Sequence, residues 1–183
     1  VPLAQIYLFM RERWDWLILQ RARFMEEPAP APVRYESGGT FQHLGHSLTL
    51  QVSEAGHNRA SRHGDVLQVA ITQERLATPD GLGGVIELWQ RREAQKVFPL
   101  RLAFCHEEMK SLRLPFPELK IRKMRTRWGS CTRKGVVTLN LELIRMPAEC
   151  IDYVVMHELC HLVEFNHSKQ FYELQSRFLP DWK

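Results

Sequence analysis

The 183-residue sequence lacks the features that mark several large classes of protein. No run approaches the roughly 18 apolar residues that a transmembrane helix needs, and the N-terminus has no charged start followed by an apolar stretch and a small-residue cleavage site. There is also no internal repeat and no low-complexity tract. We therefore expect a cytoplasmic globular protein that does not cross a membrane.

The sequence also has few cysteines and only a small excess of positive charge. The four cysteines are far apart and form no Cys-x-x-Cys pair, so we expect reduced thiols, without disulfides or a cysteine zinc site. A net charge of +4 allows an anionic partner but does not require one. With 44% hydrophobic and 25% charged residues, the composition is that of an ordinary globular protein. Because the chain does not begin with Met, we expect it to be part of a longer protein.

What the sequence does contain is His157-Glu158-Leu159-Cys160-His161, followed by His167. On an α-helix, residues four apart differ by about 40° in azimuth and lie about 6 Å apart along the axis, so His157 and His161 can bind the same ion. Glu158 falls beside that ion, where its carboxylate can reach a bound water. A catalytic zinc site needs a third protein ligand, and His167 is the nearest candidate.

His167 can join this site only if the helix ends first. A continuous helix would place it about 15 Å along the axis from His157. Asn166 tolerates the left-handed conformation that ends helices, and Ser168 is suited to cap a following helix. The spacing of the histidines equals that of the metzincin pattern, but Glu164 replaces its glycine, which argues against a metzincin fold. If His167 were not a ligand, the alternatives would be Glu164, Glu173 and Asp181.

The first half of the chain predicts a helix, a connector and a β part. Leu3 to Met25 has apolar residues at helical spacing, and Glu26 to Pro32 is too rich in proline for a helix or a central strand. A hairpin turning near Gly45-His46 and a strand from Val66 to Ile71 should follow. The histidines here have no metal-binding spacing, and we expect these four to be exposed: His43, His46, His57 and His63.

The second half predicts a long helix and then strands. The helix should begin near Gly81, and Pro99 should kink or divide it. A strand should start at Leu119, and alternation predicts another from Val136 to Leu143 after a turn near Lys134-Gly135. The last of these strands leads toward the metal helix.

Pro147 suits the first turn of the metal helix. The apolar stripe opposite the histidines is the one a core-packed helix requires, and it comprises Ile151, Val155, Leu159 and Leu162. Cys160 points about 100° away from His161, so we expect a small buried side chain. Tyr153 lies near His157 on the helix, where we favour packing over a contact that supports the ligand.

Three segments together resemble the YgjP-like family of predicted metal-dependent hydrolases, which is related to SprT-like zincin metallopeptidases. These segments are Arg127-Trp128-Gly129-Ser130-Cys131, Thr138-Leu139-Asn140, and His157 to Leu162 followed by Asn166-His167-Ser168. The resemblance covers about Ile121 to Trp182, and weaker similarity extends back to Arg11 to Trp16.

The resemblance implies an α+β fold with zinc on His157, His161 and His167, and with Glu158 as general base. Residues 79–183 would form a minimal zincin-like catalytic domain with an active-site helix and a small antiparallel sheet. Residues 1–78 would form an accessory part with an N-terminal helix, a linker and a β-hairpin.

We therefore expect a zinc-dependent hydrolase, a metallopeptidase that cleaves an amide bond in a peptide or protein. Val136 to Leu143 is the strand that we expect to hold an extended substrate. Asn140 or Arg127 would stabilise the developing oxyanion. Hydrolysis of a small-molecule amide at the same centre stays open.

The alternative is a non-catalytic module, stabilised by metal, that binds nucleic acid or a protein partner through the basic segment from Arg122 to Lys134. For this segment we favour the simpler interpretation, a solvated hairpin with Trp128 in the core. Glu158 separates the two functions, because a structural zinc site prefers four protein ligands and has no use for a carboxylate beside an open position.

Overall fold

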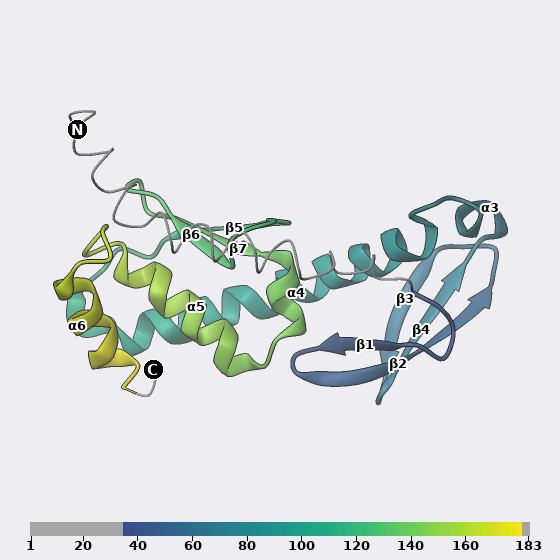
Figure 1. Ribbon diagram of the computed structural model, residues 1–183, viewed down its shortest axis with the longest axis horizontal. Coiled ribbons are helices and arrows are strands. Elements are labelled where there is room, and N and C mark those ends of the chain that lie inside the picture. The colour runs from purple at the N-terminus through teal and green to yellow at the C-terminus, as the bar shows by residue number, and fades with distance from the viewer. Residues whose placement is uncertain (1–34, 181–183) are drawn as a thin grey trace, which may run out of the picture. The chain divides into compact units, whose positions relative to one another are not determined.

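The computed structural model describes residues 35–180, which belong to one compact unit (Figure 1). The helix expected from Leu3 to Met25, the connector from Glu26 to Pro32, and Asp181 lie outside the described residues. Two small sheets and four helices make a mixed α+β fold, as the sequence predicts. The division into residues 1–78 and 79–183 stays a prediction.

The first sheet contains four strands in the order β1-β2-β4-β3. The strands are β1 (Thr40–His43), β2 (His46–Glu54), β3 (Arg59–His63) and β4 (Val66–Ile71). β1 pairs antiparallel with β2, and β3 pairs antiparallel with β4. The two central strands, β2 and β4, are parallel, with Thr49 opposite Val66. Alternate residues such as Leu48 and Leu50 are buried, so one face of the sheet forms a core and the other is polar.

The hairpin predicted near Gly45 is confirmed. Leu44 and Gly45 form its turn with φ of 50° and 78°, the left-handed conformation of the tight hairpin turns. The backbone N–H of Leu44 donates to the carbonyl of Ile144 at 2.9 Å. A Cβ on Gly45 would lie 2.9 Å from Cγ of Pro147. The tip of the hairpin therefore packs against the chain just before the metal helix.

The helix α4 (Gly81–Glu108) follows a short helix α3 (Gln73–Leu76) and takes part in two hydrophobic cores. Its first part contributes Val85, Ile86 and Trp89 to the core under the four-stranded sheet. Its second part contributes Phe98 and Leu102 to the core around the metal helix. A 3-10 turn, η1 (Lys110–Leu112), ends this region.

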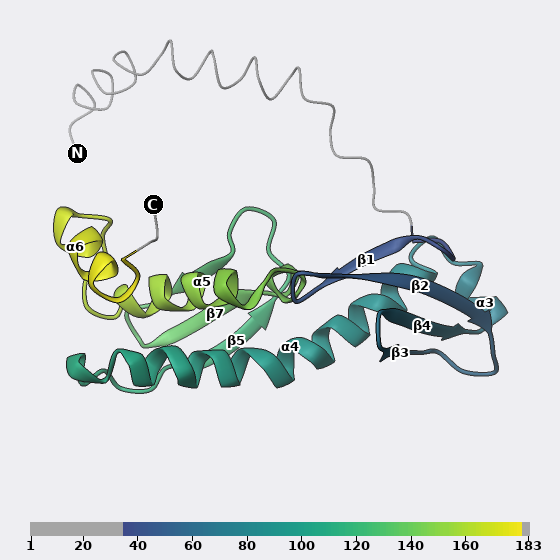
Figure 2. The same ribbon diagram turned by 90° about the horizontal axis from the view of Figure 1, so that it is seen from below.

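Pro99 does not divide α4, contrary to one of the two expectations. The helix is continuous through it, although the ribbon changes direction along its length (Figure 2). Phe98 and Leu102 on either side of Pro99 are fully buried. Burial of such side chains stabilises a structure by about 1.5–3 kcal/mol each, which offsets the roughly 3 kcal/mol cost of an interior proline.

The second sheet contains three strands in the order β5-β7-β6. They are β5 (Glu118–Arg122), β6 (Gly129–Cys131) and β7 (Val136–Asn140). β6 and β7 form an antiparallel hairpin, but β5 and β7 are parallel, so the sheet expected to be antiparallel is mixed. The reason is the strand order: β7 lies between β5 and β6, so it pairs with β6 as a hairpin and with β5, which runs in the same direction, on its other side. The strand expected to reach Leu143 ends at Asn140 and continues as a 3-10 turn, η2 (Leu141–Arg145).

The metal helix α5 (Ala148–Cys160) lies beside α4 on one face of this sheet (Figure 1, Figure 2). Ile151, Val155 and Leu159 are fully buried, as predicted for the apolar stripe. Leu162, the fourth predicted member, follows the end of the helix and is half-buried. The chain then turns into α6 (Lys169–Phe178). Ser168 caps α6 as predicted, since its hydroxyl accepts a hydrogen bond from the N–H of Phe171 at 3.3 Å.

Asn166 does not end the metal helix. α5 ends at Cys160, and Asn166 is not among the described residues with positive φ. The N–H groups of Leu162, Val163 and Glu164 donate to the last carbonyls of the helix instead. This earlier end gives the chain six residues in which to turn before His167.

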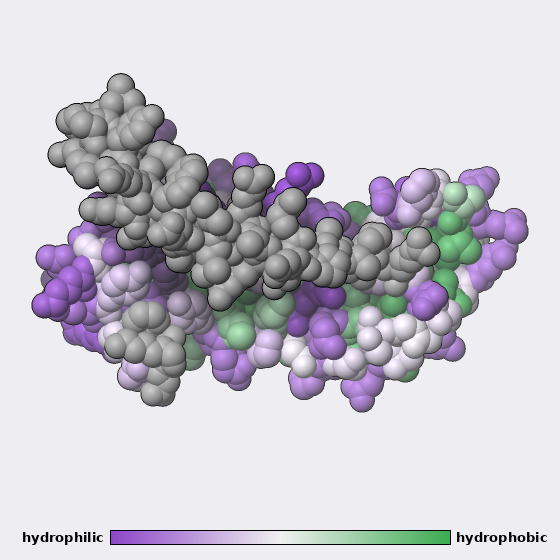
Figure 3. Space-filling view, in the orientation of Figure 1, coloured by the Kyte–Doolittle hydropathy of each residue, from purple (hydrophilic) through white to green (hydrophobic). Residues whose placement is uncertain are grey.

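Three further observations concern the helices, the surface and the cysteines. Among residues 35–180, no helix is both long and apolar enough to cross a membrane. In the face drawn in Figure 3, hydrophilic colour predominates at the α6 end, and apolar colour appears near α3 and in the middle beside the grey atoms. All four cysteines are free, and Cys160 is buried as expected.

Candidate metal centre

Three histidines converge at the C-terminal end of α5. His157 belongs to the helix, His161 caps it, and His167 lies in the turn before α6. Their ligand atoms all lie within 4.8 Å of one another, and the Nε2 atoms of His157 and His167 are 3.1 Å apart. In the described part of the chain, this is the one group of three or more His, Cys, Asp or Glu residues close enough to share an ion. The structure thus brings together the three residues that the sequence predicts as ligands.

Hydrogen bonds fix how two of these rings are oriented. Nδ1 of His157 contacts the amide oxygen of Gln175, and Nδ1 of His161 contacts the carbonyl of Glu164, both at 3.1 Å. Because these oxygens can only accept, each Nδ1 carries the hydrogen and each Nε2 is left with a free lone pair. Burial lowers the pKa of both imidazoles, which favours their neutral form. Neutral rings with converging lone pairs fit a divalent metal.

Phe171 forms the floor of this centre. Its fully buried ring stacks on His161 at 4.6 Å between centroids and meets His157 and His167 edge-on at 4.9 and 4.8 Å. The sequence analysis missed both Phe171 and Gln175. Their signal is helical spacing, since they follow His167 by four and eight residues and so share a face of α6.

Glu158 is held in a nearly closed environment, with 5% of its surface exposed. Burial raises the pKa of its carboxyl to about 7, while the charge of Arg127 acts in the opposite direction. The neighbour that closes this environment is Gly129 in β6. A Cβ there would lie 2.6 Å from Oε1 of Glu158 and 2.9 Å from Cγ1 of Val154. Glycine at this position therefore allows β6 to pack directly against the metal helix.

A cleft of about 570 Å³ opens over Glu158 and the three histidines. Its wall includes Arg127, Trp128 and Phe165. Trp128 is 48% exposed, so the expectation that it packs in the core is wrong. Its backbone carbonyl is bound by the N–H of Asn140, which holds the segment while the indole faces solvent.

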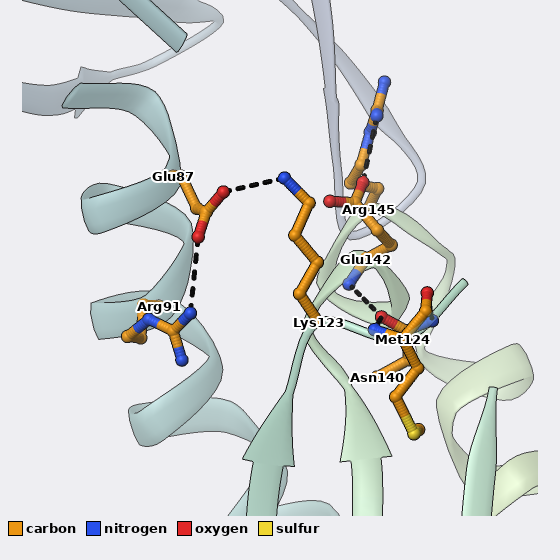
Figure 4. Close-up of polar contacts among 7 residues, drawn as sticks. All are labelled: Glu87, Arg91, Lys123, Met124, Asn140, Glu142 and Arg145. Atoms are coloured by element: carbon orange, nitrogen blue, oxygen red, sulfur yellow. Dashed lines mark hydrogen bonds and ion pairs between the residues drawn. The ribbon is translucent and has the colours of Figure 1, made fainter. Parts of the chain in front are cut away.

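Asn140, one of the two predicted oxyanion donors, lies under the basic segment and does not line the cleft (Figure 4). Its Oδ1 accepts from the N–H groups of Met124 and Glu142, each at 3.2 Å. Its Nδ2 donates to the carbonyls of Met124 and Arg127 at 3.0 and 2.8 Å. With its hydrogen-bonding capacity used on the backbone, Asn140 holds the segment that carries Arg127 and Trp128.

The strand that we expected to hold an extended substrate, β7, does not lie at an edge of its sheet. β7 is central and pairs on both sides, so it offers no free backbone groups along its edges. β6 is the outer strand next to it, and all three of its residues line the cleft. The sequence pattern identified β7 as a strand, but alternation does not show which strand lies at an edge.

Among residues 35–180, most of the basic segment forms no ion pair. Lys123 is the exception, since its Nζ lies 2.8 Å from a carboxylate oxygen of Glu87 (Figure 4). The other cations have no ion-pair partner within the described residues, and they are Arg122, Arg125, Arg127, Arg133 and Lys134. Arg133 instead places its guanidinium 5.1 Å from the ring centroid of Phe165 in the cleft wall.

The N-terminal histidines lie away from this centre. His46, His57 and His63 are exposed, as expected. His43 is buried, with 2% of its surface exposed, which contradicts the expectation for that residue. It packs against Trp89 at 4.7 Å between ring centroids, because it is on the inward side of β1 two residues after Phe41.

Comparison with known proteins places the whole sequence in one family. Residues 1–183 match the family described as YgjP-like, metallopeptidase domain. No curated protein matches the sequence. Among solved structures, the chain is similar to the crystal structure of the metallopeptidase zymogen of Pyrococcus abyssi abylysin, with 21% identity and a TM-score of 0.42. That similarity covers 46% of this chain and 81% of the other.

Proposed function

Because the chain belongs to the YgjP-like metallopeptidase family, we propose that it is a zinc-dependent peptidase in which Glu158 is the general base. The observation that carries this proposal is the convergence of three histidines beside a buried carboxyl at the bottom of an open cleft. The substrate class is a peptide or a protein, which enters the cleft in an extended conformation.

His157, His161 and His167 would hold the metal through ring nitrogens that meet within 4.8 Å. A zinc ion in such a site acts as a Lewis acid and lowers the pKa of a bound water to about 7. With three protein ligands, the site keeps a position open toward the cleft.

Glu158 has the properties of a group that accepts and returns a proton. Burial brings the pKa of its carboxyl to about 7, and a pKa near the working pH is the most effective for general acid–base catalysis. It would take the proton of the attacking water and then pass it to the nitrogen of the leaving amine. The lack of a side chain at Gly129 leaves room for this carboxyl beside β6.

β6 and Arg127 are the groups that we assign to the substrate. The outer edge of β6 can pair with an extended peptide, as in other complexes that add a strand to a sheet. Arg127 lines the cleft and acts electrostatically on Glu158, and a fixed cation there would stabilise negative charge that develops on the substrate carbonyl. Asn140 is no longer assigned a contact with the substrate.

The test compares Glu158→Gln with Glu173→Gln, an exposed carboxylate of α6, in the zinc-loaded protein. Peptide-library cleavage by mass spectrometry should identify a substrate for the parent protein. Glu158→Gln should then lose about 100-fold or more in kcat with zinc content unchanged, while Glu173→Gln should match the parent. Cleavage by Glu158→Gln at the parental rate would remove Glu158 from the mechanism, and a zinc-loaded parent that cleaves no peptide would contradict the peptidase function.

A second candidate function is binding of single-stranded nucleic acid, favoured by one observation. Trp128 is exposed, and the segment that contains it, residues 122–134, carries five cations that lack ion-pair partners among the described residues. Such a segment can combine stacking with phosphate contacts. Such binding would weaken steeply with salt. Quenching of tryptophan fluorescence by oligonucleotides, lost in Trp128→Ala, is the expected result, and no binding at low salt would exclude this function.

A further inference from the structure

Gln175 is a buried polar residue that connects a proposed metal ligand to a second side chain. It lies on α6, is 1% exposed, and contacts Nδ1 of His157 through Oε1 at 3.1 Å. Its Nε2 donates to the hydroxyl oxygen of Tyr153 at 3.4 Å. Tyr153 precedes His157 by one turn of α5 and lines the cleft. The three side chains thus form one chain of hydrogen bonds between α5 and α6.

The orientation of the Gln175 amide decides which nitrogen of His157 can bind a metal. With Oε1 toward the ring, Nδ1 must donate, so the hydrogen is on Nδ1 and Nε2 is free. With the amide turned over, its NH2 group would face Nδ1 and the hydrogen would move to Nε2. Nε2 is the atom that lies 3.1 Å from Nε2 of His167, and a hydrogen there would block the metal.

The hydroxyl of Tyr153 completes the hydrogen bonding of the Gln175 amide in the first of these orientations. It gives the NH2 group of Gln175 an acceptor within a site that is otherwise closed to water around the glutamine. A buried NH2 group without an acceptor costs about 1–3 kcal/mol. Oε1 has its partner in His157, so His157 and Tyr153 together satisfy both ends of the amide.

We propose that Gln175 and Tyr153 are positioning residues for the metal ligand His157. Tyr153 holds the Gln175 amide in place, and Gln175, with Oε1 toward the ring, keeps the hydrogen on Nδ1 so that Nε2 faces the metal. The inference rests on the proposed metal site but not on peptide cleavage. It gives Tyr153 a supporting role through Gln175, the interpretation that the sequence analysis ranked below packing.

The same segment of chain supplies three parts of the centre. His167, Phe171 and Gln175 follow one another at intervals of four residues, and they provide a proposed ligand, the ring floor and the hydrogen-bond acceptor. Docking of α6 on α5 therefore positions His157 as well as His167. Loss of the Gln175 contact should weaken metal binding even though Gln175 does not touch the ion.

The test measures the Kd for zinc by competition with a chelator in the full chain. Gln175→Met removes the acceptor at similar size and should weaken zinc binding about 10- to 100-fold, the usual effect of losing such a partner. Gln175→Glu keeps an acceptor toward His157 and should bind zinc at least as tightly as the parent. Tyr153→Phe should weaken binding about 2- to 10-fold, as expected for one neutral hydrogen bond. Gln170→Met, an exposed glutamine of the same helix, is the matched control and should change nothing.

A second readout separates positioning from a general loss of structure. In the metal-free protein, imidazole ¹⁵N–¹H correlation spectra should place the hydrogen of His157 on Nδ1 in the parent and in Gln175→Glu. Gln175→Met should shift it toward Nε2, with the circular dichroism of the parent retained. If Gln175→Met does not fold, the comparison of Gln175→Glu with Tyr153→Phe tests the same point.

Three results would overturn the inference. They are parental zinc affinity in folded Gln175→Met, equal weakening in Gln175→Glu and Gln175→Met, and a His157 tautomer that no variant changes. A protein that binds zinc with this dependence on Gln175 but cleaves no peptide would contradict the proposed peptidase function alone.

Discussion

Gly129 is the residue whose small size matters most for the candidate site. Its Cα faces the carboxyl of Glu158, and an added Cβ would lie 2.6 Å from Oε1 and 2.8 Å from Cγ of that side chain. Since real Cβ atoms essentially never approach so closely, either Glu158 or β6 must move.

We expect Gly129→Ala to lower kcat/KM at least about 10-fold, because misplacement of a catalytic group by 1 Å can cost about 100-fold. Zinc content should be unchanged, since the three atoms nearest to the added Cβ belong to Glu158 and Val154 and not to a histidine. Gly56→Ala is the control, because its Cβ would meet nothing within 4 Å. Parental kcat/KM in Gly129→Ala would show that Glu158 tolerates displacement.

His43 gives a prediction about pH. It is 2% exposed, its Nδ1 has no hydrogen-bond partner among the described residues, and burial lowers the pKa of its ring below the usual 6.5. The unfolded chain therefore binds a proton more readily than the folded one, and the stability present above pH 6.5 is lost as the pH falls.

Replacement of His43 by Leu should reduce this loss. Between pH 6.5 and 5, one proton can account for at most about 2 kcal/mol of the free energy of unfolding. Urea unfolding of the metal-free parent and of His43→Leu at both pH values measures the difference. Equal losses in the two proteins would mean that His43 does not titrate in this range.

Residues of the site could be predicted where local geometry alone determines them. His157, Glu158 and His161 follow from the angular spacing of one helix, and no distant contact is needed. The burial of Glu158 depends on β6, and the placement of Asn140 depends on the loop that begins at Met124. Such contacts join parts of the chain far apart in sequence, so no local pattern reveals them.

At the scale of elements, the sequence predicts whether a segment is a helix or a strand better than it predicts which elements lie next to it. Alternation identified β7, but it could not show that β5 and β6 would occupy both of its edges. Pro99 does destabilise a helix interior, but burial of the side chains around it offsets this cost, and α4 stays continuous. Ser168 was predictable because capping involves only its own turn.

The turn at Gly45 links two elements and can be tested by comparison with a second glycine. Gly45 and Gly38 both have positive φ, 78° and 84°, so alanine costs about 1–2 kcal/mol of conformational energy at either position. Only at Gly45 would the new Cβ also meet another residue, Pro147, at 2.9 Å. Gly45→Ala should therefore lower the free energy of unfolding more than Gly38→Ala does. Equal values from denaturant titrations would show that the hairpin tip is free to shift away from α5.

At the scale of the whole described unit, two hydrophobic cores are joined by α4. One lies under the four-stranded sheet and the other surrounds α5, and α4 contributes buried side chains to both. The proposed metal ligands lie next to the second core, because Phe171 is a member of that core and stacks on His161. Bound metal should therefore stabilise the two cores unequally.

Metal removal should loosen α6 and the turn before it while leaving the four-stranded sheet unchanged. His167 and Gln175 join this segment to His157 of α5, and zinc at 100 times its Kd would stabilise the folded state by about 2.7 kcal/mol. Hydrogen–deuterium exchange with and without a chelator measures the effect by segment. Amides of α6 should exchange faster after chelation, whereas those of β2 and β4 should keep their rates, because local opening of α6 does not require the first core to open. In His167→Ala the chelator should have a much smaller effect. An equal increase in exchange across both sheets and α6 would mean that the metal stabilises the fold as a whole, and no increase in α6 would mean that this segment does not bind it.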